Sequence, residues 1–308
     1  MRKEFRIPRK LMGNAFAITV VADNEQAAMD DIEAGFSEIS RIEKLLTTFD
    51  AESETNRINA QAGIAPVSVD PEVFQLIERS LRISRLTDGY FDISYGGIDK
   101  RFWNFDRNMQ QLPDPEMVRK HLDLVDYRNI LLNPETGTVF LKRKGMRIGF
   151  GGIGKGYAAE MAKRILVKRG VASGIVNASG DLTTWGNQAD GKPWTIGIAD
   201  PDHSTQPFSF MNITGMALAT SGNYEKFIIV GGKKYSHTIN PKTGMPVSGI
   251  KSVTIFCPNA EIADAMATPV SIMGIRPALD LINQISHLEC IIIDDQNQLY
   301  SSNNINFK

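Results

Sequence analysis

The stretch that decides the fold is residues 15–46, AFAITVVADNEQAAMDDIEAGFSEISRIEKLL. Its first part, 15–21, is an apolar run that predicts a strand. After Asp23-Asn24, apolar side chains recur at steps of three and four, which predicts an amphipathic helix over 29–46. The apolar positions of this helix are Met29, Ile32, Phe36, Ile39, Ile42 and Leu46. A strand that leads directly into a long helix predicts a fold that mixes helices and sheet.

Patterns of the same two kinds continue along the chain, and the second half is mostly strand-like. A second helix starts around Pro71 and stops at Asp88-Gly89. The pair Gly231-Gly232 between two apolar runs predicts a β-hairpin. The other expected helices cover 157–169, 260–273 and 277–285, and the expected strands cover 138–148, 173–177, 194–199, 208–213, 227–230, 235–239, 252–257 and 290–293.

No internal repeat, low-complexity tract or flexible linker divides the sequence. A polar stretch covers 50–59, and an excursion rich in aromatic and polar residues covers 96–116. A chain of 308 residues is long enough for one large domain or two packed ones. We therefore predict a single compact α+β unit over residues 1–308, with two packed lobes, mixed or antiparallel sheets, helices on their faces and no clean internal boundary.

Charge and cysteine content argue against several functional classes. Thirty-four basic and 35 acidic residues give a net charge of -1, with no block of like charge. Nucleic-acid-binding domains usually carry a basic patch, so we expect no nucleic-acid partner. The two cysteines, Cys257 and Cys290, lie in apolar runs without the spacing of a metal site. They are expected to be buried free thiols.

The first twenty residues contain no apolar signal segment and no lipid-acceptor cysteine. No apolar run reaches the length of a membrane span, so we expect no transmembrane segment. If Met1 is the native start, these features predict a cytoplasmic protein. The alternative is an exported or periplasmic lipoprotein whose signal segment has been removed, since its remaining chain would look the same.

Residues 149–156, GFGGIGKG, form a glycine-rich turn between a predicted strand and a predicted helix. A dinucleotide-binding turn requires an acidic residue at the end of the next strand, where this chain has Asn177. A P-loop requires Ser or Thr after the lysine, where this chain has Gly156. Both matches are therefore partial. Both motifs bind phosphate in the same way, because their glycines let backbone amides approach it, and residues 149–156 could do so as well. The alternative is a tight turn that binds no ligand.

Asp264 and Thr268 stand four residues apart on a predicted helix and therefore share a face. Oxygen ligands of this kind suit Mg²⁺, which often takes further ligands from substrate phosphates. Pro269 next to them cannot donate a backbone hydrogen bond, which would kink the helix or free the carbonyl of Ala265. A solvated helix face is the structural alternative.

His237 lies where the strand 235–239 runs into a turn punctuated by proline and glycine. A histidine in this position is a candidate general base or phosphate-binding residue. A histidine that only stabilises the turn is the alternative.

Four segments in a fixed order resemble the ApbE family of FAD:protein FMN transferases, formerly called thiamine biosynthesis lipoproteins. They are Met12-Gly-Asn14, Asp88-Gly-Tyr-Phe-Asp92, Gly152-Ile-Gly-Lys-Gly-Tyr-Ala158 and Ser236-His-Thr-Ile-Asn-Pro-Lys-Thr-Gly-Met-Pro246. The segments 176–181, 220–224 and 263–268 are also similar to the family, so the resemblance covers about residues 12–274. It implies a T-fold-like α+β architecture and a flavin transferase.

The resemblance also implies site residues at matching positions. The expected FAD contacts are Met12, Phe49, Tyr90, Phe91, Asp92, Gly149, Lys155 and Ile239. The expected metal ligands are Asp264, Thr268, the carbonyl of Gly152 and the backbone of Ala267. Phe49 stands where the family often has a tyrosine that stacks on the flavin, and phenylalanine keeps the aromatic face.

Two positions depart from the family pattern, which usually has aspartate where this chain has Gly149 and Asn240. The first change removes an expected polar contact to FAD, and the second removes a charge beside His237. Because the expected metal ligands are intact, we expect the chemistry to persist with altered affinity or a narrower set of acceptors.

The implied reaction is a Mg²⁺-dependent transfer of the FMN half of FAD to a Thr or Ser hydroxyl of an acceptor flavoprotein, with release of AMP. Asp264 would hold the metal, Lys155 would hold phosphate, and His237 would assist deprotonation of the acceptor hydroxyl. The acceptor, a redox subunit or a soluble reductase, is not identified by the sequence. A metal-dependent FAD pyrophosphatase and a non-catalytic FAD-binding protein are the alternatives.

Overall fold

The computed structural model describes residues 2–97, 111–120, 122–199, 207–222 and 227–305. Within these ranges the helices are α1 (Glu25–Leu46), α2 (Glu54–Ala60), α3 (Pro71–Leu86), α4 (Pro115–Lys120), α5 (Gly154–Lys168), α6 (Ala260–Met273) and α7 (Ile275–Ile282). The strands are β1 (Lys3–Leu11), β2 (Asn14–Ala22), β3 (Val67–Ser68), β4 (Ile130–Asn133), β5 (Thr138–Leu141), β6 (Gly174–Ala178), β7 (Asp181–Trp185), β8 (Trp194–Ala199), β9 (Pro207–Ile213), β10 (Ala217–Gly222), β11 (Phe227–Val230), β12 (Lys233–Ser236), β13 (Ile250–Cys257), β14 (Glu289–Asp294) and β15 (Leu299–Ser301). Most of the excursion predicted over 96–116 lies outside the described residues.

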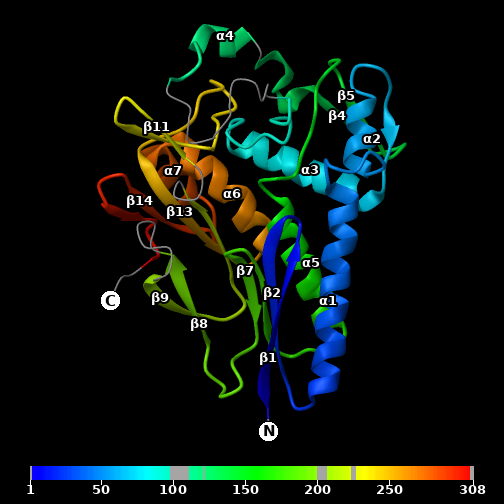
Figure 1. The fold of residues 1–308 in the computed structure, drawn as a ribbon, viewed down its shortest axis with the longest axis vertical. Helices are drawn as coiled ribbons and strands as arrows, with labels where there is room; N and C mark the ends of the chain where they lie inside the picture. The colour runs from blue at the N-terminus through cyan, green and yellow to red at the C-terminus, as the bar shows by residue number, and fades with distance from the viewer. Residues whose placement is uncertain (1, 98–110, 121, 200–206, 223–226, 306–308) are drawn as a thin grey trace.

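An eight-stranded sheet forms the centre of the molecule, with the order β1-β2-β6-β7-β10-β13-β14-β15 (Figure 1). Each pair of neighbouring strands in it is antiparallel. Ser179 and Gly180 join β6 to β7 with φ angles of 57° and 103°. Positive φ at both loop residues suits a tight two-residue hairpin, and this hairpin places Asp181 at the start of β7.

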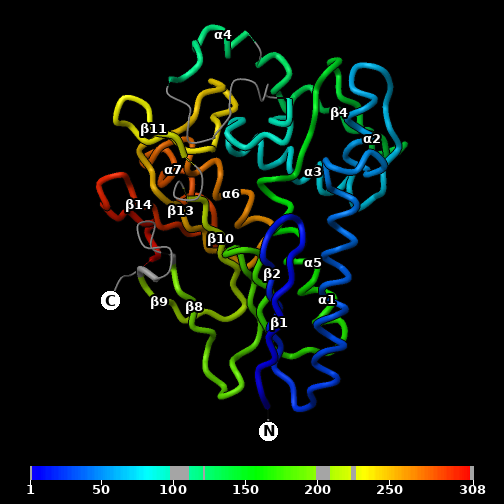
Figure 2. Tube along the Cα trace, viewed as in Figure 1, coloured from blue at the N-terminus to red at the C-terminus, as the bar shows by residue number. Residues whose placement is uncertain are grey.

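Helices α1, α5 and α6 cover one face of this sheet. α1 packs against β2 and α5, whereas α6 packs against α5, β10 and β13. The apolar stripe predicted over 29–46 makes this contact, because Ile32, Phe36 and Ile39 are fully buried. Figure 2 shows the chain of α1 running beside the β1–β2 hairpin for most of its length. Burial of this stripe is the main force that holds the helical layer on the sheet.

The opposite face of the sheet carries a smaller core beneath the β8–β9 hairpin. There Trp194 and Ile198 of β8 pack with Leu218 of β10 and Phe256 of β13. A three-stranded sheet, β3-β5-β4, lies apart from the main sheet, with α2 and α3 beside it (Figure 1). The α+β class with antiparallel sheets is thus confirmed, while the division into two lobes stays a prediction.

Some elements differ from the sequence prediction. Residues 3–11, where the sequence predicts no element, form β1, and Pro8 is tolerated because β1 is an edge strand. β5 ends at Leu141 rather than at residue 148, because the chain turns at Gly145 with a φ of 89°. The polar stretch at 50–59 contains α2, whose N-terminus is capped by the Ser53 side chain.

Other expectations hold in the described residues. Gly231 and Gly232 form the β11–β12 hairpin turn with positive φ, and Cys257 and Cys290 are buried and free. In the part of the chain that the structure describes, every helix is too short or too polar to cross a bilayer.

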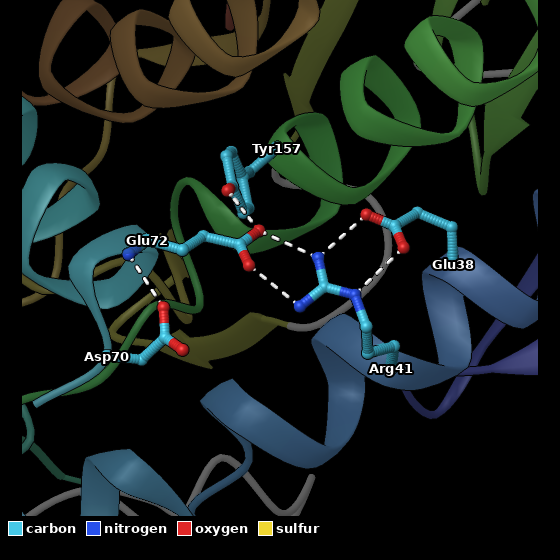
Figure 3. A network of polar contacts seen from close by, with 5 residues as sticks. All are labelled: Glu38, Arg41, Asp70, Glu72 and Tyr157. Atoms are coloured by element: carbon cyan, nitrogen blue, oxygen red, sulfur yellow. Dashed lines mark hydrogen bonds and ion pairs between the residues drawn. The ribbon is translucent and has the colours of Figure 1, made fainter. Parts of the chain in front are cut away.

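A network of charged side chains ties α1, α3 and α5 together (Figure 3). Arg41 of α1 donates hydrogen bonds to both Glu38 and Glu72, and the Tyr157 hydroxyl of α5 donates to Glu72. Asp70 caps α3 by accepting the backbone N–H of Glu72. Although burial alone would raise it, the hydrogen bonds from Arg41 and Tyr157 lower the pKa of Glu72. Because Tyr157 directly follows the glycine turn, this network fixes the start of α5.

Candidate active site

The glycine turn at 149–153 leads into the N-terminus of α5, which lies against α6. Ile153 at the N-cap offers no capping side chain. Asp264 of α6 takes that role, since the backbone N–H of Gly156 donates to its Oδ2 at 2.8 Å. A Cβ at Gly156 would stand only 2.1 Å from the carbonyl oxygen of Ala260. Glycine at 156 therefore lets α5 and α6 approach closely enough for Asp264 to reach the turn.

Lys155 lies between two buried carboxylates. Its Nζ forms an ion pair with Asp181 of β7 and lies 3.6 Å from Oδ1 of Asp264. Asp181 and Asp264 are only 3% and 6% exposed. The second oxygen of Asp181 accepts the backbone N–H of Thr220 on β10 at 3.0 Å. The three charged side chains thus come from α5, β7 and α6 and meet behind the glycine turn.

Burial and neighbouring charges act in opposite directions on the pKa values of Lys155 and Asp181. Burial disfavours charged lysine, but the carboxylates of Asp264 and Asp181 hold the pKa of Lys155 above its ordinary value. Burial raises the pKa of Asp181, and the positive charge of Lys155 opposes that rise. The cluster combines one basic side chain, Lys155, with two buried acidic side chains, Asp181 and Asp264.

A cavity of about 430 Å³ opens in front of the same turn. Four segments line it: residues within 90–96, 149–152 and 237–241, together with Thr268 and Ile272 of α6. The Thr268 hydroxyl lies 3.5 Å from the position that a Cβ on Gly152 would take, so the two expected metal ligands adjoin each other. The volume falls in the range of small-molecule sites, roughly 300–1,000 Å³.

Asp92 holds one wall of the cavity in place. Its Oδ1 accepts the backbone N–H and the hydroxyl of Ser94 at 2.7 and 2.6 Å, and its Oδ2 accepts the backbone N–H of Tyr127 at 2.8 Å. Burial raises the pKa of Asp92, and these hydrogen bonds oppose the rise. Asp92 therefore organises the wall, and its contact with FAD stays a prediction.

The turn at 236–246 forms the facing wall and is tied to the 88–92 segment. Lys242 donates to Asp88 at 2.6 Å, and its ammonium lies 4.1 Å from the centre of the Tyr90 ring. Asn240 Oδ1 accepts the backbone N–H of Lys242 at 2.9 Å. An aspartate, which the family pattern has at 240, could accept this hydrogen bond through a carboxylate oxygen. Asparagine at 240 therefore preserves the conformation of the turn.

The structure brings most of the predicted site residues together. The cavity is lined by Tyr90, Phe91, Asp92, Gly149, Gly152, His237, Ile239 and Thr268. Lys155 and Asp264 adjoin it through the charged cluster, and the end of the Met12 side chain lies 3.6 Å from the Cβ position of Gly154, at the start of α5.

Two predicted residues lie apart from the cavity lining. Phe49 is 98% exposed in the loop after α1, although the neighbouring Thr48 approaches Gly149. The side chain of Ala267 is buried in the main core. The family-like segment 220–224 extends into residues outside the described part of the chain. Roles for these residues in binding FAD or metal stay predictions.

Two residues of the site were not predicted from sequence. Asp181 stands in the sequence only as the last residue of the family-like segment 176–181, although a carboxylate at the start of a buried strand requires a partner. Tyr95 lines the cavity, and its hydroxyl lies 3.7 Å from the Cβ position of Gly149. No sequence pattern singles out Tyr95, because its place depends on the pairing of residue 95 with Arg147.

The oxygen donors at the turn fit Mg²⁺ rather than a softer metal. Among the described residues, no group of three or more His, Cys, Asp or Glu side chains could hold a metal ion by itself. Within the described ranges, no backbone N–H donates to Oδ1 of Asp264, and Thr268 stands one helical turn away beside Gly152. A hard cation with few protein ligands, completed by substrate phosphates, suits such a set.

Comparison with known proteins agrees with this architecture. An FAD:protein FMN transferase of Klebsiella pneumoniae is 30% identical over 285 residues, covering 92% of this chain and 87% of the relative. A second protein of that name from Treponema pallidum is 29% identical and covers 87% of this chain and 77% of the relative. The crystal structure of the ApbE protein of Thermotoga maritima superposes with a TM-score of 0.88 at 28% identity, covering 97% of both chains. The ApbE family model matches residues 12–292, and the chain belongs to the ApbE family.

Proposed function

We propose that this chain is a Mg²⁺-dependent FAD:protein FMN transferase. The observation that carries the proposal is the cavity beside the glycine turn, where Thr268 and Gly152 meet and Lys155 and Asp264 lie directly behind. This combination offers an apolar space for a flavin next to groups that bind phosphate and a hard cation. The relatives that bear the transferase name support the same activity.

In this proposal the residues of the chain position the pyrophosphate of FAD. The positive end of the α5 helix dipole lies at this point, and Lys155 adds a positive charge there. Asp264, Thr268 and the carbonyl of Gly152 would hold Mg²⁺, which supplies neutralisation of charge on the phosphates when bound. Tyr90 and Ile239 on opposite walls would enclose the flavin ring.

The reaction itself is a phosphoryl-type transfer. The oxygen of a Thr or Ser hydroxyl on the acceptor forms a bond to the FMN-side phosphorus, and the bond from that phosphorus to the bridging oxygen breaks. FMN becomes linked to the acceptor through a phosphoester, and AMP leaves with the bridging oxygen. His237 on the cavity wall would receive the hydroxyl proton.

The test uses the purified protein with FAD and Mg²⁺, with and without a co-expressed candidate acceptor flavoprotein. The expected result is an acceptor mass increased by one FMN, with one AMP per transfer and little AMP in the absence of acceptor. Steady release of FMN and AMP without acceptor would instead show a pyrophosphatase. FAD that stays intact under every condition, with several acceptors, would show a binding protein.

A further inference from the structure

Tyr95 is a cavity residue whose backbone is held on both sides. It pairs with Arg147 in an isolated parallel bridge, and its N–H donates to the carbonyl of Asp92 at 3.3 Å. Asp92 is itself anchored by Ser94 and Tyr127. The position of Tyr95 is therefore set by the structure around it, yet 43% of the residue is exposed. A large aromatic side chain fixed in this way and open to a cavity is available to a ligand.

The hydroxyl of Tyr95 reaches the glycine turn. A Cβ on Gly151 would stand 2.4 Å from this oxygen, so glycine at 151 makes room for it. Burial raises the pKa of this hydroxyl, and the adjacent backbone of Gly151 opposes the rise. A phenol hydroxyl carries one O–H that it can donate. Among the residues that the structure describes, no acceptor for that O–H is seen.

The surroundings of the hydroxyl identify the acceptor it would find in a ligand. The turn leads directly into α5, whose N-terminus favours an anion, and Lys155 adds positive charge there. A flavin nucleotide in the cavity would direct its phosphates toward this end. We propose that the Tyr95 hydroxyl donates a hydrogen bond to a phosphate oxygen of bound FAD, an inference that rests on the proposed function.

Tyr95→Phe tests this inference because it removes the hydroxyl and keeps the ring. The affinity for FAD, measured by calorimetry at fixed Mg²⁺, is expected to fall about tenfold or more, since hydrogen bonds to charged groups are among the stronger ones. Binding of riboflavin, which has no phosphate, is expected to be unchanged. Tyr300→Phe is the matched control, because it removes a hydroxyl on β15 whose one partner among the described residues is Asp294, at 3.1 Å.

The outcomes separate this inference from the proposed function. Wild-type protein that binds no FAD would overturn both. Wild-type protein that binds FAD, with Tyr95→Phe within twofold of it, would overturn the role of Tyr95 alone. Equal weakening of FAD and riboflavin would overturn the phosphate contact, because the hydroxyl would then act on the flavin. Thermal unfolding of both variants checks that the fold is kept.

Discussion

Gly156→Ala should be among the most damaging single changes near the site. The added Cβ would stand 2.1 Å from the carbonyl oxygen of Ala260 and 2.6 Å from Cβ of Asp264. Both contacts are far below van der Waals separation, and the nearer one involves backbone that cannot rotate away. The variant must therefore push α5 and α6 apart, which also weakens the hydrogen bond from residue 156 to Asp264.

The expected cost follows from two opposing effects. Overpacking in a well-packed region costs about 1–3 kcal/mol and sometimes more, and the backbone contact places this change at the upper end. Replacing glycine by alanine inside a helix, by contrast, stabilises the folded state by about 0.5–1 kcal/mol. We expect a net loss of about 2 kcal/mol in the free energy of unfolding, measured by urea denaturation. FMN transfer should fall more steeply than stability, because Asp264 is displaced.

Gly154→Ala is the matched control in the first turn of the same helix, α5. A Cβ there would lie 3.5 Å from Phe150 and 3.6 Å from Met12, which are ordinary contacts. This variant should keep its activity and gain up to about 1 kcal/mol of stability. If Gly156→Ala were as stable and active as wild type, the close approach of α5 and α6 would be refuted. Equal losses of stability in Gly154→Ala and Gly156→Ala would also refute this close approach. Glycine would then be needed at both positions for backbone conformation alone.

Three further predictions concern the charged site, the network behind it and the thiols. Asp264→Asn keeps an oxygen that can accept the N–H of residue 156 but loses the negative charge. The rate of FMN transfer, measured across a Mg²⁺ titration, should therefore fall at least about a hundredfold. Thr268→Ala should lower the rate of transfer by a smaller factor. Tyr157→Phe removes the hydrogen bond to the carboxylate of Glu72 and should cost about 1–2 kcal/mol in urea denaturation, with unchanged stability as the contrary result. Burial raises the pKa of Cys257 to about 11 and that of the other thiol to about 12, so both should react with a thiol reagent at pH 8 only on unfolding. The folded state favours the protonated form of both thiols. Their contribution to the free energy of unfolding is therefore complete below the ordinary thiol pKa of 9.0, and it is lost as the pH rises through the folded-state pKa values of about 11 and about 12.

The elements that sequence predicts well are those whose signal is local. α1 is recognisable because its apolar stripe and its Asn24 cap lie within one continuous stretch. β10, with the sequence ALATSG, has no such signal, since small and polar residues dominate it. It is a strand because β7 and β13 pair with it on either side and α6 covers it. These partners lie far from β10 in the sequence, so the local sequence of residues 217–222 does not predict the strand.

The same distinction applies to the site. The glycine turn, Asp264 and His237 stand out as motifs, and the structure brings them to one cavity and the cluster behind it. Asp181 belongs to that cluster only because the β6–β7 hairpin directs it toward Lys155. The sequence motif therefore identifies the turn, but the acid that pairs with its lysine is supplied by the sheet.

The charge of this cluster bears on which function the cavity serves. Asp181 and Asp264 place two negative charges around the single positive charge of Lys155, directly behind the turn. A site built only to bind the anionic pyrophosphate of FAD would be weakened by the uncompensated carboxylate, because like charges repel strongly where water is excluded. In the proposed function, a divalent cation held by Asp264 would offset that repulsion and make the carboxylate favourable. Beside its capping of α5, the placement of Asp264 next to Thr268 therefore favours the proposed metal-dependent transferase over a protein that only binds FAD.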